Sequence, residues 1–259
     1  MQNLNNKVSV IIPAYNASKT IVKALESVCS QSYRDYEIIV VNDGSSDDTS
    51  KLVEQYRIEN NLVNLTLIDK ANGGVSSARN VAIKAAKGGW LAFLDADDSW
   101  HKRKLEVVSW FFDEDFSLIG HSYQTEAFME NYTDLKYFEV KKVNYTFFDI
   151  LMRNRFTTPS VVLKNTSEIY FDEDMRYAED HDLWLRISAK KKALFLDISL
   201  VLLSRPLLTK GGLSGSKLKM RAGEFRMYKK ASKYNKNMRL LVPFLIAFSS
   251  FKFLLKIFR

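Results

Sequence analysis

Two kinds of hydrophobic pattern alternate along the chain as far as Leu94. Short apolar, β-branched runs predict buried strands, and longer segments with an apolar residue every three or four positions predict amphipathic helices. The strands are expected at Val8–Ile12, Glu37–Val41, Leu65–Ile68 and Trp90–Leu94. The helices between them are expected from the Ser18 cap to Val28, from Asp47 to Glu59 and from Val75 to Lys87. This alternation predicts an α/β fold with a mostly parallel sheet, right-handed crossovers and flanking helices.

The pattern changes after Asp98. Helices are expected near Lys102–Phe112, Phe147–Asn154 and Glu179–Ala189, and short strands at Val161–Leu163 and Ala193–Leu196. The aromatic-rich stretch from His121 to Tyr145 follows neither period and is expected to be irregular. No repeat, low-complexity tract or linker separates the two parts. We therefore expect residues 1–98 and 99–216 to form two halves of one continuous domain.

Composition limits the class of protein. With 259 residues, 46% of them hydrophobic, the chain can bury one sizeable core. The single cysteine, Cys29, excludes an internal disulfide and lies in an apolar helical stretch, so we interpret it as a core residue. The opening segment Met1–Asn6 is polar and lacks the pattern of a signal peptide, which predicts a cytoplasmic protein.

Basic charge is concentrated near the C-terminus. Residues 217–259 hold 12 Lys and Arg and one acid, a net charge of +11, whereas the preceding 216 residues have a net charge of −3. Helical spacing places one group of polar and basic residues opposite a second, apolar group. The polar group is Ser249, Lys252, Lys256 and Arg259, and the apolar group is Phe244, Phe248, Phe251, Leu255 and Phe258. This pattern is typical of a helix that lies in the plane of an anionic membrane.

We therefore interpret residues 217–259 as a basic amphipathic segment that associates with a membrane. One alternative is a helix that packs on the protein's own core. A spanning helix is the other, although charges interrupt the ~20 apolar residues that a span needs. Nucleic acid is not an expected partner, because a phosphate-binding tail gains nothing from a row of phenylalanines.

Four aspartates follow two of the expected strands. Asp43 comes after Glu37–Val41, and Asp95, Asp97 and Asp98 follow Trp90–Leu94. In an open α/β sheet, ligands bind beyond the carboxyl ends of the strands, so these carboxylates are expected to converge on one crevice. Clustered acids repel one another, and Mg²⁺ or Mn²⁺ takes one or two carboxylates together with phosphate oxygens. The sequence therefore predicts a metal–diphosphate site.

Two further motifs are open to a structural interpretation as well as a functional one. The glycine turn at Asn72–Asn80 opens a helix that carries Arg79, but it has neither of the common phosphate-loop spacings. Glu179 and Asp180 begin a helix, where carboxylates suit the helix dipole. Asp180 shares a face with Trp184 and Ile187 and is therefore a candidate for pointing into a cleft.

Together these segments resemble a family 2 glycosyltransferase with the GT-A fold. The resemblance rests on four motifs in order, listed here: Val8–Asn16, Val41–Asp47 with Asn72–Asn80, Leu94–Asp98, and Phe171–Asp174 followed by Ala178–Arg186. It implies an enzyme at the cytoplasmic face of a membrane that transfers a sugar from a nucleotide diphosphate donor with inversion. Residues 99–216 would then be the acceptor-binding half.

The resemblance also implies roles for individual residues. Asp43 would hold the base, typically uracil, and Asp180 would be the general base that takes the proton of the attacking hydroxyl. Asp97 and Asp98 would contact the ribose and a Mn²⁺ or Mg²⁺ ion that offsets charge on the leaving diphosphate. The remaining residues expected to bind the nucleotide sugar are Pro13, Ala14, Tyr15, Asn16, Gly74, Arg79 and Asp95.

The acceptor side is less well defined by the sequence. Trp100, Glu179 and Trp184 are candidates for contact with the acceptor, the tryptophans by stacking on a sugar ring. Some family members have a histidine after the catalytic helix that completes metal binding, whereas here the loop 205–216 contains none. That loop would instead supply Arg205 or Lys210 to the diphosphate, act as a glycine-hinged lid, or serve as a plain linker.

The expected reaction moves a hexose such as glucose or galactose from a UDP-sugar to a saccharide linked to undecaprenyl diphosphate. Such a step belongs to O-antigen or capsule assembly, on the cytoplasmic face of the inner membrane. A lipopolysaccharide core or another polysaccharide is the alternative acceptor. A nucleotidyltransferase and an inactive membrane-bound scaffold are the alternatives from other functional classes.

Overall fold

The computed structural model describes residues 6–127, 132–206, 217–235 and 238–257. Lys210 and the lid expected in residues 207–216 lie outside these described residues. The same holds for Arg259 and Phe258, and for the side chains of Phe248, Lys252, Leu255 and Lys256.

The N-terminal half is the expected parallel sheet. Its strands lie in the order β3-β2-β1-β4, and all three of the pairings are parallel. The strands are β1 (Val8–Ala14), β2 (Tyr36–Asp43), β3 (Leu65–Lys70) and β4 (Trp90–Phe93). The connecting helices are α1 (Ile21–Cys29), α2 (Thr49–Glu59) and α3 (Val75–Ala85). Each of these elements confirms the one predicted from the hydrophobic pattern.

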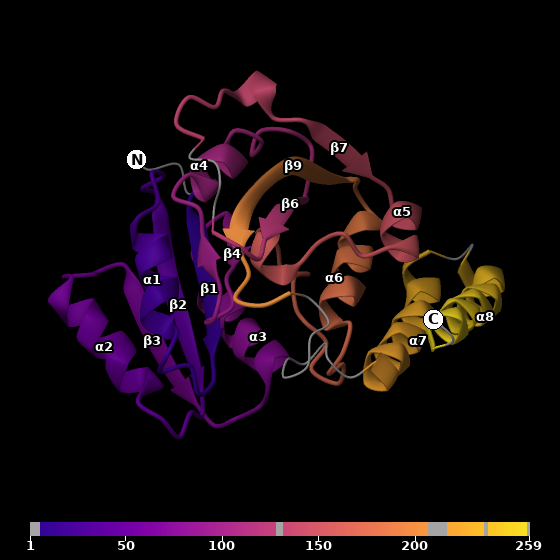
Figure 1. The fold of residues 1–259 in the computed structure, drawn as a ribbon, viewed down its shortest axis with the longest axis horizontal. Coiled ribbons are helices and arrows are strands. Elements are labelled where there is room, and N and C mark those ends of the chain that lie inside the picture. The colour runs from indigo at the N-terminus through magenta and orange to yellow at the C-terminus, as the bar shows by residue number, and fades with distance from the viewer. Residues whose placement is uncertain (1–5, 128–131, 207–216, 236–237, 258–259) are drawn as a thin grey trace.

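The alternating side chains of the strands bury both faces of this sheet. Val10 and Ile12 of β1 face the core that α1 and α2 cover, whereas Ile11 faces the core that α3 covers. Figure 1 shows α1 and α2 on one side of the strands and α3 on the other. The carboxyl ends of β1, β2 and β4 consequently open at the same edge of a three-layer body.

The second half extends the same sheet with mixed strand directions. Beyond β4 the order continues as β8-β6-β9-β5, with β7 paired to the side of β9. The strands are β5 (Ser99–Trp100), β6 (Leu118–Gln124), β7 (Lys142–Tyr145), β8 (Val162–Lys164) and β9 (Ala193–Leu202). The helices are α4 (Lys104–Ser109), α5 (Phe147–Met152) and α6 (Glu179–Ser188), with short 3₁₀ turns at Tyr137–Glu139 and Thr158–Ser160.

Two expectations for this half were wrong. The stretch His121–Tyr145 is not irregular throughout, because it holds most of β6 and all of β7. The strand expected at Ala193–Leu196 continues to Leu202. β6 and β9 pair with register shifts near Ser122, and such irregularities remove the two-residue period that identifies a strand in a sequence.

Two long helices follow the sheet, α7 (Lys217–Tyr234) and α8 (Met238–Ile257). Figure 1 places them at the end of the molecule farthest from α2, with α7 next to α6. Met227, Tyr228 and Ala231 of α7 are buried in the same hydrophobic cluster as Leu183 and Trp184 of α6. The boundary expected between residues 216 and 217 is therefore not a boundary of the hydrophobic core.

Polar contacts also hold α7 against α6. The carboxylate of Asp182 on α6 is fully buried, and it accepts hydrogen bonds from Lys230 Nζ at 2.8 Å and Tyr234 Oη at 2.7 Å. Near the start of α7, Gly223 permits a close approach of this helix to the backbone of Tyr177. A Cβ at this position would lie 2.5 Å from the carbonyl oxygen of Tyr177.

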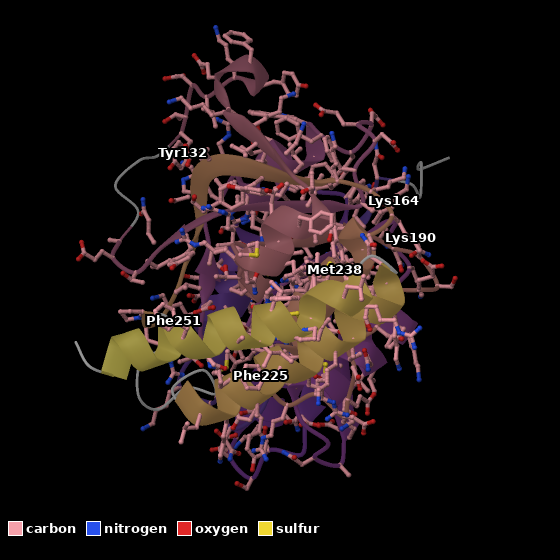
Figure 2. All side chains as sticks on the ribbon, turned by 90° about the vertical axis from the view of Figure 1, so that its right-hand side faces the viewer. Tyr132, Lys164, Lys190, Phe225, Met238 and Phe251 are labelled. Carbon is pink, nitrogen blue, oxygen red and sulfur yellow. The ribbon has the colours of Figure 1, made fainter. Side chains whose placement is uncertain are left out.

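α8 lies along the outer side of α7, with Met238 and Phe251 toward its opposite ends (Figure 2). Its inward residues Val242, Leu245 and Ile246 pack against the second core cluster. Ser249, expected on the exposed polar face, is instead buried and accepts a hydrogen bond from Arg221 of α7. The exposed apolar residues of α8, called here the outer face, are Leu240, Leu241, Phe244 and Phe251.

Among the described residues, no helix has the length and apolar character that crossing a membrane requires. The described part of the segment 217–259 therefore packs on the protein's own core, which was one of the alternatives considered for it. The outer face of α8 is nevertheless apolar and exposed.

Replacement of Gly223 by Ala tests the packing of α7 against Tyr177. In an ordinary helix this change stabilises by up to ~1 kcal/mol. Here the new methyl group meets the Tyr177 carbonyl, and we expect a loss of about 1–3 kcal/mol in the free energy of unfolding. Urea denaturation followed by circular dichroism measures it. The neighbouring exposed change Ala222→Ser is the control and should alter stability by less than ~0.5 kcal/mol. A stabilised Gly223→Ala variant would contradict the packing of α7 on this turn.

Candidate active site

A cleft of about 2090 Å³ opens at the carboxyl ends of β1, β2 and β4. Its walls come from the ends of these strands, the start of α3, the start of α6 and one side of α7. The expected position of the site is thus the position of the large cleft. Among the described residues, every one expected to act at the site lines this cleft, except for the two tryptophans described below.

The segment Pro13–Asn16 forms one end of the cleft. Asn16 has a positive φ of 49° and is held by the loop after β2: its N–H donates to Ser45 Oγ at 2.9 Å, and its Oδ1 accepts from the N–H of Ser46 at 2.9 Å. Tyr15, next to it, is 56% exposed and so offers a ring face at the cleft. A flat, exposed aromatic ring is suited to stacking on a nucleotide base.

Asp43 lies at the end of β2 with 3% of its surface exposed. Its Oδ1 accepts from Lys70 Nζ at 2.6 Å and from the N–H of Gly73 at 2.9 Å, and its Oδ2 accepts from the N–H of Gly74 at 2.7 Å. Gly74 has a φ of 87°, which favours glycine. Asp43 therefore shapes the glycine turn, and the two N–H groups of this turn point at a carboxylate instead of at a phosphate.

Arg79 connects the acidic groups of the two halves. Its side chain is 4% exposed, and its Nη2 donates to Asp95 at 2.7 Å while its Nη1 lies 3.4 Å from Glu179. The guanidinium also lies 5.0 Å from the ring centre of Phe171. Burial acts to lower the pKa of Arg79, but the adjacent Asp95 and Glu179 outweigh it and the pKa lies above its ordinary value. The group is therefore a permanent buried cation.

Asp97 and Asp98 face the loop after β9. Asp97 Oδ2 accepts from Ser204 Oγ at 3.0 Å and from Arg205 Nη2 at 2.8 Å, whereas Asp98 Oδ1 accepts from the N–H of Ser204 at 2.8 Å. Asp98 is 8% exposed, and burial together with the charge of Asp95 raises its pKa well above the usual range for a carboxyl group. Three carboxyl groups, those of Asp95, Asp97 and Asp98, are thus gathered in this corner of the cleft.

A divalent cation fits the chemistry of that corner. Carboxylate oxygens are the ligands that Mg²⁺ and Mn²⁺ prefer, and a cation would favour the ionised form of Asp98, whose pKa is raised by burial and, to a smaller extent, by Asp95. No group of three or more His, Cys, Asp or Glu in the described parts of the chain could hold a metal by itself. Asp97 and Asp98 would therefore hold a cation together with oxygens of a bound diphosphate, whose charge the cation would offset.

The first turn of α6 carries three acids with different surroundings. Glu179 faces Arg79, yet burial and the neighbouring Asp180 outweigh that cation and raise the Glu179 pKa. Asp182 is bound by Lys230 and Tyr234. Asp180 lines the cleft, with its Oδ2 3.5 Å from Asn154 Nδ2. Asp180 Oδ1 also accepts from the N–H of His181 at 2.6 Å, but of the three acids it is the one without a salt bridge in the described part of the chain.

Burial excludes the stacking role expected for two tryptophans. Trp184 has no exposed surface, and its indole N–H donates to the carbonyl of Phe156 at 3.3 Å. Trp100 is 3% exposed, and the Nζ atom of Lys104 lies 3.6 Å from its ring centre. Neither ring has a face for a sugar. Tyr123 of β6 is 37% exposed and lines the cleft, but it lies in the stretch expected to be irregular.

A basic wall of the cleft has no counterpart among the sequence predictions. Arg153, Arg155 and Arg176 line the cleft and are exposed, and α7 contributes Arg221 to the lining. No motif marks these residues, because they come from two loops and a helix that only the fold brings together.

Solved structures with the same fold include Staphylococcus aureus TarS in complex with UDP-GlcNAc. It has a TM-score of 0.68 and 24% identity, and the match covers 88% of this chain and 66% of that one. The mannosyltransferase PcManGT of Pyrobaculum calidifontis, solved with GDP-Man and Mn²⁺, has a TM-score of 0.67 and 19% identity, and covers 93% and 72% of the two chains. Both are GT-A glycosyltransferases, so the expected fold is confirmed.

Curated relatives found by sequence similarity are also glycosyltransferases. WfgD of Escherichia coli, a UDP-Glc:α-D-GlcNAc-diphosphoundecaprenol β-1,3-glucosyltransferase, is 31% identical over 213 residues, which cover 82% of this chain and 81% of WfgD. TarS, a poly(ribitol-phosphate) β-N-acetylglucosaminyltransferase, is 31% identical over 189 residues, which cover 67% of this chain and 31% of TarS. The chain likewise spans only 26–31% of the length of three uncharacterized glycosyltransferases of Rickettsia that it matches.

The model of the family named "Glycosyl transferase family 2" matches residues 9–163, which include the ends of β1 and β2, the glycine turn and the three aspartates after β4. More than half of the chain lies within this match. The chain therefore belongs to glycosyl transferase family 2.

Proposed function

We propose that the protein transfers a hexose from a UDP-sugar to a lipid-linked saccharide, with inversion, in the assembly of a bacterial surface polysaccharide such as O-antigen or capsule. The observation that carries the proposal is the position of Arg79. This one buried cation lies between Asp95, in the loop with Asp97 and Asp98, and Glu179, next to Asp180. Carboxylates from the loop proposed to bind the donor and from the helix proposed to act on the acceptor thereby meet at one cation in the cleft.

The proposed reaction is a single displacement. Asp180 accepts the proton of an acceptor hydroxyl while the hydroxyl oxygen attacks the anomeric carbon of the sugar. The bond between that carbon and the β-phosphate oxygen breaks, and UDP leaves from the opposite face. A cation held by Asp97 and Asp98 would offset the charge on UDP, and Arg205, 2.8 Å from Asp97, would add a second positive charge there.

The geometry of the site and the donors of related proteins both support a UDP-sugar donor. Tyr15 offers a ring for stacking, and the buried carboxylate of Asp43 lies at the same end of the cleft. WfgD takes UDP-Glc, and TarS has been solved with UDP-GlcNAc. Family membership favours sugar transfer over nucleotidyl transfer. The lipopolysaccharide core and other polysaccharides remain the alternative acceptors.

We further propose that the protein acts on the cytoplasmic face of the inner membrane, and the outer face of α8 supports its association with a membrane surface. Leu240 and Phe244 are 82% and 73% exposed, on a segment with a net charge of +11. Apolar side chains that insert below the headgroups and basic residues attracted to anionic lipids act together in such helices. A peripheral enzyme of this kind would meet a lipid-linked acceptor at the membrane surface.

Replacing Asp180 by Asn tests the general base. The change keeps size and the contact with Asn154 but removes basicity, so we expect kcat to fall about 10²–10⁴-fold with UDP binding nearly unchanged. UDP release in the presence of acceptor measures kcat, and calorimetry measures binding. Asp174→Asn, an exposed acid outside the cleft, is the control and should keep full activity. Activity of Asp180→Asn within a few-fold of wild type would transfer the role to Glu179.

Replacing Asp97 by Ala tests the metal–diphosphate site. The variant loses the Asp97 carboxylate, one of the two groups proposed to bind the cation. We therefore expect transfer to be abolished and UDP binding in Mn²⁺ to weaken by about tenfold or more. Asp113→Ala, exposed and outside the cleft, should behave as wild type. Normal turnover of Asp97→Ala in EDTA would overturn the metal-dependent interpretation. Wild-type protein that binds UDP-sugars but releases no UDP from any of them would instead indicate an inactive scaffold.

The membrane position is tested by substitution of the outer face instead of deletion, because α8 is also packed on α7. The fourfold change of Leu240, Leu241, Phe244 and Phe251 to Ser should abolish flotation with anionic liposomes. Full-length protein should also detach partly at high salt and from neutral vesicles. Ser at Ile58 and Val63, exposed apolar positions in the other half, is the control and should leave flotation intact. A fourfold variant that still floats would overturn the membrane role of α8.

A further inference from the structure

Three arginines stand out on the wall of the cleft that surrounds Asp180. Arg153 and Arg155 come from the loop after α5, and Arg176 precedes the left-handed residue Ala178 that starts α6. All three side chains are exposed. In the described part of the chain, no carboxylate forms a salt bridge with any of them, whereas Arg186 and Arg226 nearby are paired with Asp182 and Asp174.

Their position is set by buried neighbours. Asn154, between the first two arginines, has its Nδ2 3.5 Å from Asp180 Oδ2, which places this loop next to the proposed base. Phe156, directly after Arg155, is buried in the core, and the Arg155 guanidinium lies 5.2 Å from the ring centre of Tyr145. The loop is therefore anchored, and its positive charges belong to the Asp180 side of the cleft.

The corner of the cleft at Asp97 and Asp98 already has what a donor diphosphate needs. Arg205 lies beside Asp97, and a cation at Asp97 and Asp98 would bridge the phosphates there. Arg153, Arg155 and Arg176 are thus extra cations on the acceptor side. An arginine fork matches the oxygens of a phosphate group better than it matches a neutral sugar.

We propose that Arg153, Arg155 and Arg176 form a subsite for phosphate groups carried by the acceptor. The proposal rests on the proposed transfer reaction and specifies the acceptor further: its sugar hydroxyl meets Asp180 while its phosphates contact these arginines. A diphosphate that joins a saccharide to a lipid is one source of such a group, and a phosphodiester chain is the other.

The position of α7 favours the lipid source. α7 lines the cleft through Met220, Arg221 and Tyr228, and Arg221 also donates a hydrogen bond to Ser249 of α8, the helix with the apolar outer face. Figure 1 shows this order, α6, α7 and then α8, toward one end of the molecule. A lipid anchored where the outer face meets a membrane would therefore approach the cleft from the arginine side.

Binding of defined probes tests the subsite in the presence of saturating UDP and Mg²⁺, so that the donor site is filled. The probes are undecyl diphosphate, the neutral undecyl maltoside and a glycerol-phosphate oligomer. We expect undecyl diphosphate to bind better than undecyl maltoside, and binding to weaken about tenfold or more in the double variant Arg153→Gln/Arg176→Gln. Arg34→Gln, an exposed arginine outside the cleft, is the matched control and should bind as wild type.

Arginine-dependent binding of the glycerol-phosphate oligomer in preference to undecyl diphosphate would support the subsite and assign it to a phosphodiester chain. Equal binding of the neutral and charged alkyl probes, or a double variant that binds the diphosphate as wild type does, would overturn the subsite. UDP affinity is measured separately in each protein. Wild type that binds UDP but discriminates no phosphate probe loses only the subsite, whereas wild type that does not bind UDP loses the proposed function itself.

Discussion

The buried guanidinium of Arg79 is the interaction on which the arrangement of the cleft depends. A buried cation is costly unless carboxylates surround it, and here they come from the loop after β4 and from the start of α6. Asp95 and Glu179 are 84 residues apart in the chain, so their common partner fixes the distance between the two halves. Asp97 and Asp98 on one side, and Asp180 on the other, are positioned through it.

The N-terminal half is predictable from the sequence because local patterns and the fold agree there. β1, β2 and β4 are largely buried strands of a parallel sheet and appear in the sequence as short apolar runs, β3 is its partly exposed edge strand, and the helices between them each bury one face. The loops that follow such strands open at one edge by geometry alone. Hydrophobic pattern and strand geometry are therefore sufficient to place Asp43 and the aspartates after β4 in one crevice.

Predictions for the second half fail where the environment of a residue is not encoded locally. Tryptophan is a residue type that stacks on sugars, but the environment of both tryptophans prevents it. Trp184 packs in the core against Phe93 and Phe171, and the side chain of Lys104 lies over the ring of Trp100. The charge of the basic C-terminal segment favours an interpretation in which it is separate from the domain. The partner that ties it to the domain, Asp182, is one acid among three in the first turn of α6.

The first turn of α6 thus distributes three neighbouring carboxylates to three parts of the molecule. Glu179 faces the buried cation of the donor half, Asp180 faces the cleft, and Asp182 holds α7 through Lys230 and Tyr234. The proposed base is therefore fixed between two ion-paired neighbours within a single helical turn. Because α7 also packs against α8, the outer face is connected to α6 through buried contacts only two residues from Asp180. In this arrangement α7 packs against both the helix that is suited to a membrane, α8, and the helix that carries the proposed base, α6.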